Sequence, residues 1–148
     1  MSNIENSDFL VRVTSAFNNL LVRGALKLES SLYDPKAFGN AAVTLVGKNF
    51  KIRLIRDRGD MIADAASAAD PENWFPLERV LSAIGISPAP LEGLLPPEQA
   101  AELVESYLND LERDFDQSHI EQTRRALRQI KRFALKRLLD KAREHHIS

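Results

Sequence analysis

The stretch FKIRLIRDRGDMIADAA, residues 50–66, alternates apolar and polar side chains on both sides of a glycine. Successive side chains of a β-strand point to opposite faces, so Phe50, Ile52 and Leu54 share one face of an extended chain. Most of the charged residues fall on the other face or in the turn. The stretch therefore predicts a β-hairpin with an apolar face and charged edges.

The register of this hairpin depends on the length of its loop. A two-residue loop at 58–59 places Arg53 opposite Asp64, where the two side chains form a cross-strand ion pair, and it keeps Asp64 away from the apolar face. A three-residue loop suits the turn chemistry better, because a two-residue type I′ loop also requires a positive φ at Arg58. We favour the two-residue loop, because the three-residue loop would place Asp64 on the apolar face.

The charges at the hairpin tip have a second interpretation, in which they form a recognition loop, since loops often carry function. These charges belong to Arg56, Asp57, Arg58 and Asp60. Alternation along the two strands explains most of the other charges without a functional role.

The rest of the chain completes an α+β fold. Apolar residues at spacings of three and four predict an N-terminal helix over 8–28, and 40–46 alternates like a strand, which gives a three-stranded antiparallel β-meander with 50–56 and 60–66. Pro76 and Gly85 bound a short helix. A C-terminal long α-helical hairpin follows, with helices from Pro97 to about residue 115 and from 118 to about 144.

These elements predict a single α+β domain over 1–148. Its core of helix and sheet covers 1–86, a proline-rich linker covers 87–97, and the helical hairpin covers 98–148. The first helix is expected to cover the apolar sheet face. A chain of this length is long enough for one domain with a real core.

Composition excludes several classes of function. The 148 residues include no cysteine, which excludes thiol catalysis, disulfides and cysteine-based zinc sites and fits a reducing compartment, so we expect the cytoplasm. The net charge of −1 predicts neither a nucleic-acid nor a membrane partner. The N-terminus does not read as a secretory signal, and no apolar run is long enough for a membrane span.

The near-zero net charge hides two strongly charged segments. Residues 98–116 contain seven acidic residues and one arginine, for a net charge of −6, and residues 119–146 contain nine basic and three acidic residues, for a net charge of +6. At 100° per residue, an acidic stripe falls opposite the apolar face of its helix. The stripe contains Glu98, Glu102, Glu105, Glu112 and Asp116.

Two interpretations of the charged segments stay open. They are either solvated helix faces or partner-binding surfaces, because a stripe of one sign speeds association with an oppositely charged partner. The partner-binding hypothesis takes the acidic stripe together with Trp74, an aromatic residue of the kind that anchors interfaces. The two stripes could also pair between copies and form a homo-oligomer.

Nucleic-acid binding through the basic helix is the alternative function. Its candidate residues are Arg124, Arg125, Arg128, Arg132 and Lys136. The neighbouring acidic helix and the lack of a recognisable nucleic-acid-binding motif count against it.

Catalytic and metal sites have little support in the sequence. The three histidines, His119, His145 and His146, stand at a helix start and at the C-terminus, and no phosphate-binding loop, nucleophile elbow or metalloprotease motif is present. We therefore predict no metal, no cofactor and no catalytic residue. An enzyme with dispersed residues is the third alternative.

Two segments, RDRGDMIADAA (56–66) and ENWFPLERVLSAIG (72–85), resemble small uncharacterised bacterial proteins, some of which are immunity-type partners of polymorphic toxins. The resemblance implies a non-enzymatic protein that binds and blocks a cognate toxin, and it defines no site residue. The acidic stripe would suit a basic, nuclease-like toxin. The leading hypothesis is therefore a non-catalytic protein-binding module.

Overall fold

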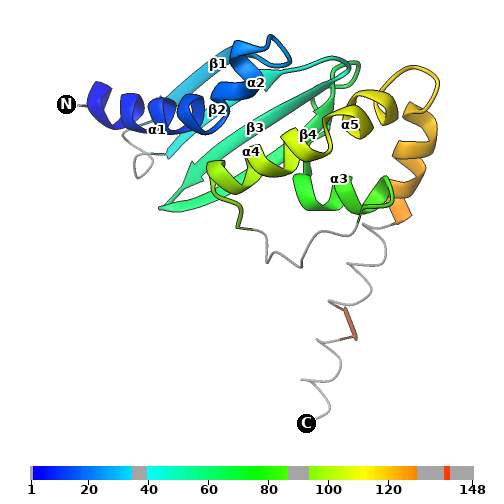
Figure 1. Ribbon diagram of the computed structural model, residues 1–148. Helices are drawn as coiled ribbons and strands as arrows, with labels where there is room; N and C mark the ends of the chain where they lie inside the picture. The colour runs from blue at the N-terminus through cyan, green and yellow to red at the C-terminus, as the bar shows by residue number, and fades with distance from the viewer. Residues whose placement is uncertain (1, 35–39, 87–93, 130–138, 141–148) are drawn as a thin grey trace.

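The computed structural model describes residues 2–34, 40–86, 94–129 and 139–140, which form one layer of antiparallel sheet and one layer of helices (Figure 1). The strands, in sheet order, are β1 (Lys27–Asp34), β2 (Asn40–Val46), β3 (Phe50–Asp57), β4 (Asp60–Ser67) and β5 (Phe75–Pro76). The helices are α1 (Ser2–Ala16), α2 (Asn18–Val22), α3 (Leu77–Ala83), α4 (Pro97–Ser106) and α5 (Leu108–Asp114), and residues 120–129 are also helical. The predicted α+β class is confirmed.

The β3–β4 hairpin has the predicted two-residue loop. Arg53 lies opposite Asp64, and its Nη2 is 3.1 Å from the Asp64 carboxylate. Arg58 and Gly59 both have positive φ, at 52° and 86°, as a type I′ turn requires. The apolar face thus determines the register, because a slip by one residue would turn every side chain of a strand to the opposite face.

The sheet has five strands rather than the predicted three. β1 lies in a region assigned to the end of the first helix and to a turn-rich connection, and that assignment is wrong. A bulge between Leu28 and Ser30 interrupts the alternation of β1 and hides its period of two. β5 has only two residues, and Pro76 fits it because a proline is tolerated in an edge strand.

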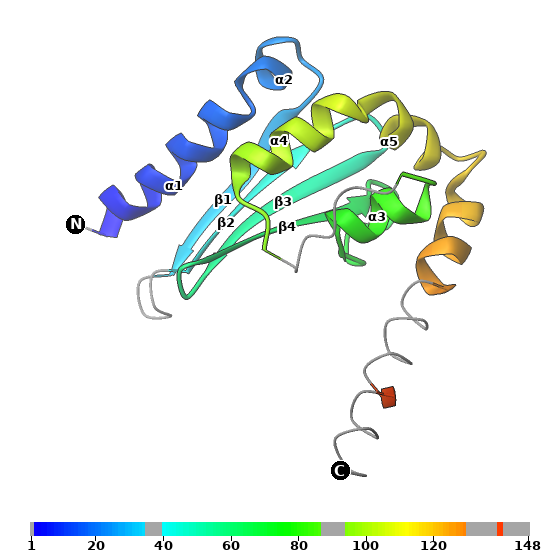
Figure 2. The ribbon, with the colours of Figure 1, turned by 60° about the horizontal axis from the view of Figure 1, so that its bottom comes forward.

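One face of the sheet carries the core. The predicted apolar residues Phe50, Ile52 and Leu54 are buried there with the apolar side of α1. The first helix covers only part of this face, because α1 packs on β1 and β2 whereas α4 packs on β4 (Figure 2). Buried residues from 9 to 127 belong to one core cluster, so the linker and hairpin regions contribute to the same core as the sheet.

The helix boundaries partly differ from the predicted ones. The first helix begins at Ser2, breaks at Phe17 and ends before Gly24, whose φ is 75°. The predicted helix from Pro97 to about 115 is divided at Tyr107. The short helix agrees with prediction: Pro76 precedes it, and Gly85 beyond its end has a φ of 92°.

The C-terminal helices do not form the predicted antiparallel hairpin over the described residues. The segment 120–129 leaves α5 at a steep angle and does not fold back along α4 in either view (Figures 1 and 2). The rest of the predicted second helix, apart from 139–140, lies outside the described residues. Within the described ranges, every helix is too short or too polar to cross a membrane.

The β2–β3 turn is fastened to the helix layer. Asn49 has a φ of 74° and donates a side-chain hydrogen bond of 2.9 Å to the backbone carbonyl of Glu112, in the second half of α5. A Cβ on Gly47 would lie 2.9 Å from Leu26 and from Phe50, so only glycine fits between these buried side chains. The turn therefore sets the distance between the sheet end and α5.

Candidate binding groove

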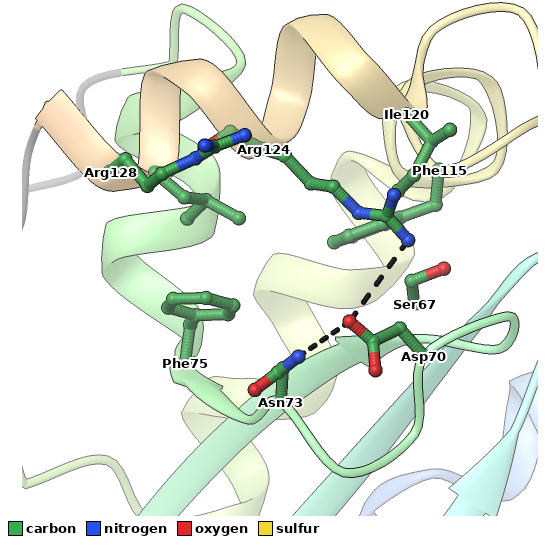
Figure 3. Close-up of a pocket in the computed structure, with 9 residues that line it drawn as sticks. Ser67, Asp70, Asn73, Phe75, Phe115, Ile120, Arg124 and Arg128 are labelled. Carbon is green, nitrogen blue, oxygen red and sulfur yellow. Dashed lines mark hydrogen bonds and ion pairs between the residues drawn. The ribbon is translucent and has the colours of Figure 1, made fainter.

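A groove of about 430 Å³ lies between the β4–β5 connection and the helix at 120–129 (Figure 3). The end of β4 contributes Ser67, the connection contributes Asp70 and Asn73, and β5 contributes Phe75. The other side of the groove is formed by Phe115, Ile120, Arg124, Leu127 and Arg128. Its volume is within the range of ligand-binding pockets, about 300–1,000 Å³.

One part of the groove is polar and largely paired. Arg124 lies 2.8 Å from a carboxylate oxygen of Glu121 and 4.0 Å from one of Asp70. Asp70 also accepts a hydrogen bond from the side chain of Asn73 (Figure 3). Ser67 accepts a hydrogen bond of 3.1 Å from the backbone N–H of Ala69. These contacts hold the wall of the groove in place.

The other part is apolar and depends on how the 120–129 helix is attached. Leu127 and Thr123 are buried. The Thr123 hydroxyl donates to the carbonyl of Asp114 at 2.6 Å, which ties the helix to the end of α5. At the start of the helix, the backbone N–H of His119 donates to the Asp116 carboxylate at 2.9 Å. The groove is thus built from two segments, 67–75 and 115–128, that are at least 40 residues apart in sequence.

Arg128 is the exposed cation of the groove wall. Its Nε donates only a long hydrogen bond, 3.4 Å, to the carbonyl of Arg124. No ion pair of Arg128 is found with the residues described. Arg128 and Arg124 are four residues apart, so they lie on the same side of the helix.

Two of the five residues of the predicted acidic stripe contact arginines. Glu98 binds Arg12 of α1 through two contacts, at 2.7 and 3.0 Å, and this hydrogen bonding holds the pKa of Glu98 below its ordinary value. Glu105 lies 3.9 Å from Arg23. Glu102 stays exposed between them. Part of the charge expected to face a partner is therefore balanced within the chain.

The remaining stripe residues are not on the same helix as Glu98. Glu112 is half-buried on α5, beyond the break at Tyr107. Asp116 follows α5 and lies 2.8 Å from Nδ1 of His119, a hydrogen bond that lowers the pKa of Asp116. The break and these local partners divide the stripe into separate groups.

Trp74 lies beside the groove rather than on the acidic stripe. Its ring stacks under the Arg53 guanidinium, 4.3 Å from the ring centroid, next to the Arg53–Asp64 ion pair. Its neighbours Asn73 and Phe75 line the groove. Because Trp74 is the only tryptophan, its fluorescence reports on this region without labelling.

Glu78, at the start of α3, makes a pH-dependent contribution to the stability of the folded state. One of its carboxylate oxygens is buried without a hydrogen-bond partner among the described residues. Burial is the main reason that the pKa of Glu78 is raised. The negative charge of nearby Asp64 also raises it. The folded state therefore favours protonated Glu78, so Glu78 by itself contributes a decline of stability as pH rises from the ordinary glutamate pKa through the raised value. Glu98 and Asp116, whose pKa values are lowered, contribute in the opposite direction.

We expect Glu78→Gln to remove this contribution, because glutamine stays neutral at every pH. The free energy of unfolding, measured with urea at several pH values between 4 and 7, checks the expectation. Glu72→Gln, at an exposed glutamate, is the control and should keep the pH dependence of the unmodified protein. An unchanged pH dependence in Glu78→Gln would show that other groups cause it.

The predicted nucleic-acid residues are only partly described. Arg124 and Arg128 line the groove, and Arg125 is exposed outside it. Arg132 and Lys136 lie outside the described residues. Since Arg124 is paired with two carboxylates, the described helix does not present an uninterrupted row of unpaired cations.

Sequence reasoning missed the groove. It singled out neither Asp70 and Asn73 nor Phe115, Ile120 and Leu127 as a site. No cluster of three or more metal-ligating side chains occurs in the described ranges, and no histidine lines the groove. The arrangement can hold an apolar group beside a cation.

Comparison of the chain with protein-family models, with curated proteins and with solved structures gave no match.

Proposed function

We propose that this chain is a non-catalytic protein-binding module whose groove binds an apolar segment of a partner protein. That segment also carries an acidic residue, which lies beside Arg128. The observation that carries the proposal is the composition of the groove walls. Phe75, Phe115, Ile120 and Leu127 supply apolar contact, and Arg128 supplies an accessible positive charge. Aromatic and arginine side chains are the types that dominate protein–protein binding energy.

The same walls favour a protein over a nucleic acid. Asp70 stands within the groove and would repel a phosphate backbone. Arg124 is already paired, so few cations remain to release counterions from a nucleic acid. The sequence resemblance suggests an immunity-type role, which makes a toxin the first partner class to test.

The partner can be located with a photo-crosslinking amino acid. We would place it at Asn73, which is exposed at the groove, and at Ser106, which is exposed on α4 outside the groove, as the control. The proposal expects a defined protein crosslinked from position 73 and absent from position 106. Crosslinks to the same protein from both positions, or to nucleic acid from position 73, would contradict it.

Charge reversal then tests the groove quantitatively. We expect Arg128→Glu to weaken binding of the crosslinked partner by about tenfold, equivalent to about 1.4 kcal/mol, because it places a carboxylate beside the acidic residue of the partner. Arg125→Glu makes the same charge change on the same helix outside the groove, and it should change the affinity less than about twofold. Affinities are measured by titrating Trp74 fluorescence or by calorimetry.

An equal loss in both variants would indicate diffuse electrostatic attraction. That result would favour the alternative function, nucleic-acid binding, which also predicts a steep decrease of affinity with salt.

A further inference from the structure

β1 forms a long open edge of the sheet. It has eight residues, whereas β5 at the other edge has two, and no strand among the described residues pairs with the outer side of β1 (Figure 1). An edge strand presents a row of unpaired N–H and C=O groups, which can pair with another chain. The outer side of β1 is therefore a potential site of strand addition.

Exposed apolar side chains gather on the elements of this edge. Six large hydrophobic residues are strongly exposed in the described ranges, and four of them lie on α1, α2 and β1, namely Val11, Val22, Leu28 and Leu32. These three elements are adjacent in both views (Figures 1 and 2). Both layers of the fold, helix and sheet, thus carry exposed apolar groups at the same side of the molecule.

The bulge in β1 places apolar groups on both faces of the strand. Leu28 pairs with Leu45 of the core face, whereas Leu32 pairs with Ala42 of the open face. Without the bulge, residues 28 and 32 would share a face. A chain that pairs with β1 can therefore cover a leucine above the sheet and another below it.

Several charged groups near this edge have partners inside the chain, whereas Lys27 of β1 is exposed and has no ion pair among those found for the described residues. Arg12 and Arg23 are paired with Glu98 and Glu105 of α4, and Glu29 lies 2.9 Å from Lys51. Covering the edge would therefore bury few charges that have no ion partner. A buried charge without a partner strongly destabilises an interface.

We propose that β1 pairs antiparallel with β1 of a second copy of this chain. A two-fold axis perpendicular to the sheet, midway between the two β1 strands and level with the middle of each, joins two five-stranded sheets into one of ten strands and keeps both helix layers on the same face. A lone peptide strand would cover Leu32 but not Val22, whereas a second copy brings a sheet layer and a helix layer together. The inference does not depend on the groove.

The size of the edge agrees with a stable interface. Eight residues at about 3.3 Å each give a length of about 26 Å, and the sheet and helix layers together are roughly 20 Å thick. The contact is then about 500 Å² per copy, or about 1,000 Å² in total, which is near the lower limit for a specific interface.

Sedimentation equilibrium of the full chain tests the proposal. The unmodified protein should sediment as a dimer at micromolar concentration, and Leu32→Lys combined with Val22→Lys should give a monomer, with half the mass. Leu94→Lys is the control, since Leu94 is also an exposed large hydrophobic residue, at 51%, but lies away from this edge, and the variant should stay dimeric. A monomeric unmodified protein, or a dimer that survives the double substitution, would overturn the proposal.

A second test does not rely on weakening the interface. Because the chain has no cysteine, single substitutions Ser30→Cys and Ser31→Cys report on the middle of β1. With the axis at this point, one of the two residues faces its own copy within the Cα distance of a disulfide, about 4.4–6.8 Å. We expect one of them to give a disulfide-linked dimer on mild oxidation, and Ser106→Cys, exposed on α4, to give none. Failure of both variants, or equal crosslinking of Ser106→Cys, would also overturn the proposal.

Discussion

Replacing Phe50 by alanine is expected to lower the free energy of unfolding by about 3–5 kcal/mol, the range measured when buried phenylalanines are truncated. The ring is fully buried at the start of β3. The glycine at position 47 leaves the space that the ring occupies, since a Cβ there would lie 2.9 Å from the ring. The backbone of the turn cannot move inward to fill the cavity, because Asn49 holds it to α5.

Urea denaturation followed by circular dichroism measures this effect. Leu94→Ala serves as the control, because Leu94 is 51% exposed and its truncation should change the stability by no more than about 0.5 kcal/mol. If the two variants were equally stable, Phe50 would not be a core residue, and the register of the β3–β4 hairpin would have to be revised.

The hairpin could be predicted from sequence because local and tertiary signals agree there. Alternation put Phe50, Ile52 and Leu54 on one face, and burial of that face requires the register in which Arg53 meets Asp64. The turn preference of Arg58 pointed to a longer loop, but burial of a whole sheet face outweighs the strain of one residue with positive φ.

The first strand could not be predicted because its pattern is not periodic. A bulge shifts the alternation, and an edge strand needs little apolar surface, so Lys27–Asp34 reads as neither a clear helix nor a clear strand. Similarly, the two residues of β5 are too few to carry any period. Pro76 and Gly85 were informative because they act through their own backbone conformations, which tertiary contacts rarely change.

The site was harder to predict than the fold, because it depends on contacts between distant segments. Arg12 and Glu98 are 86 residues apart, and nothing local indicates that α1 would neutralise the acidic stripe. The groove likewise requires that the helix after α5 turns toward β5 instead of folding back. Apolar residues such as Phe75 and Leu127 read as core in sequence, and only the fold shows that they also line a groove.

Leu127→Ala is expected to destabilise the attachment of the 120–129 helix by about 2–5 kcal/mol, as truncation of buried leucines does. Leu127 is 3% exposed, and it is the buried apolar residue that this helix contributes to the core in its described part. The remaining contacts are weaker: partly buried Ile120, the 4.0 Å contact of Arg124 with Asp70, and the hydrogen bond from Thr123 to the carbonyl of Asp114. A single such bond contributes only about 0.5–1.5 kcal/mol, so it cannot replace the lost packing.

Hydrogen exchange distinguishes loss of the helix from loss of the fold. Amides of 120–129 should exchange faster in Leu127→Ala, whereas amides of β3 should keep their protection, because β3 is paired on both sides within the sheet. Gln122→Ala, exposed on the same helix, should leave both unchanged. Equal loss of protection in β3 would mean that the helix and the sheet unfold as one unit. Selective loss, together with weaker partner binding, would show that the groove exists only while this helix is attached.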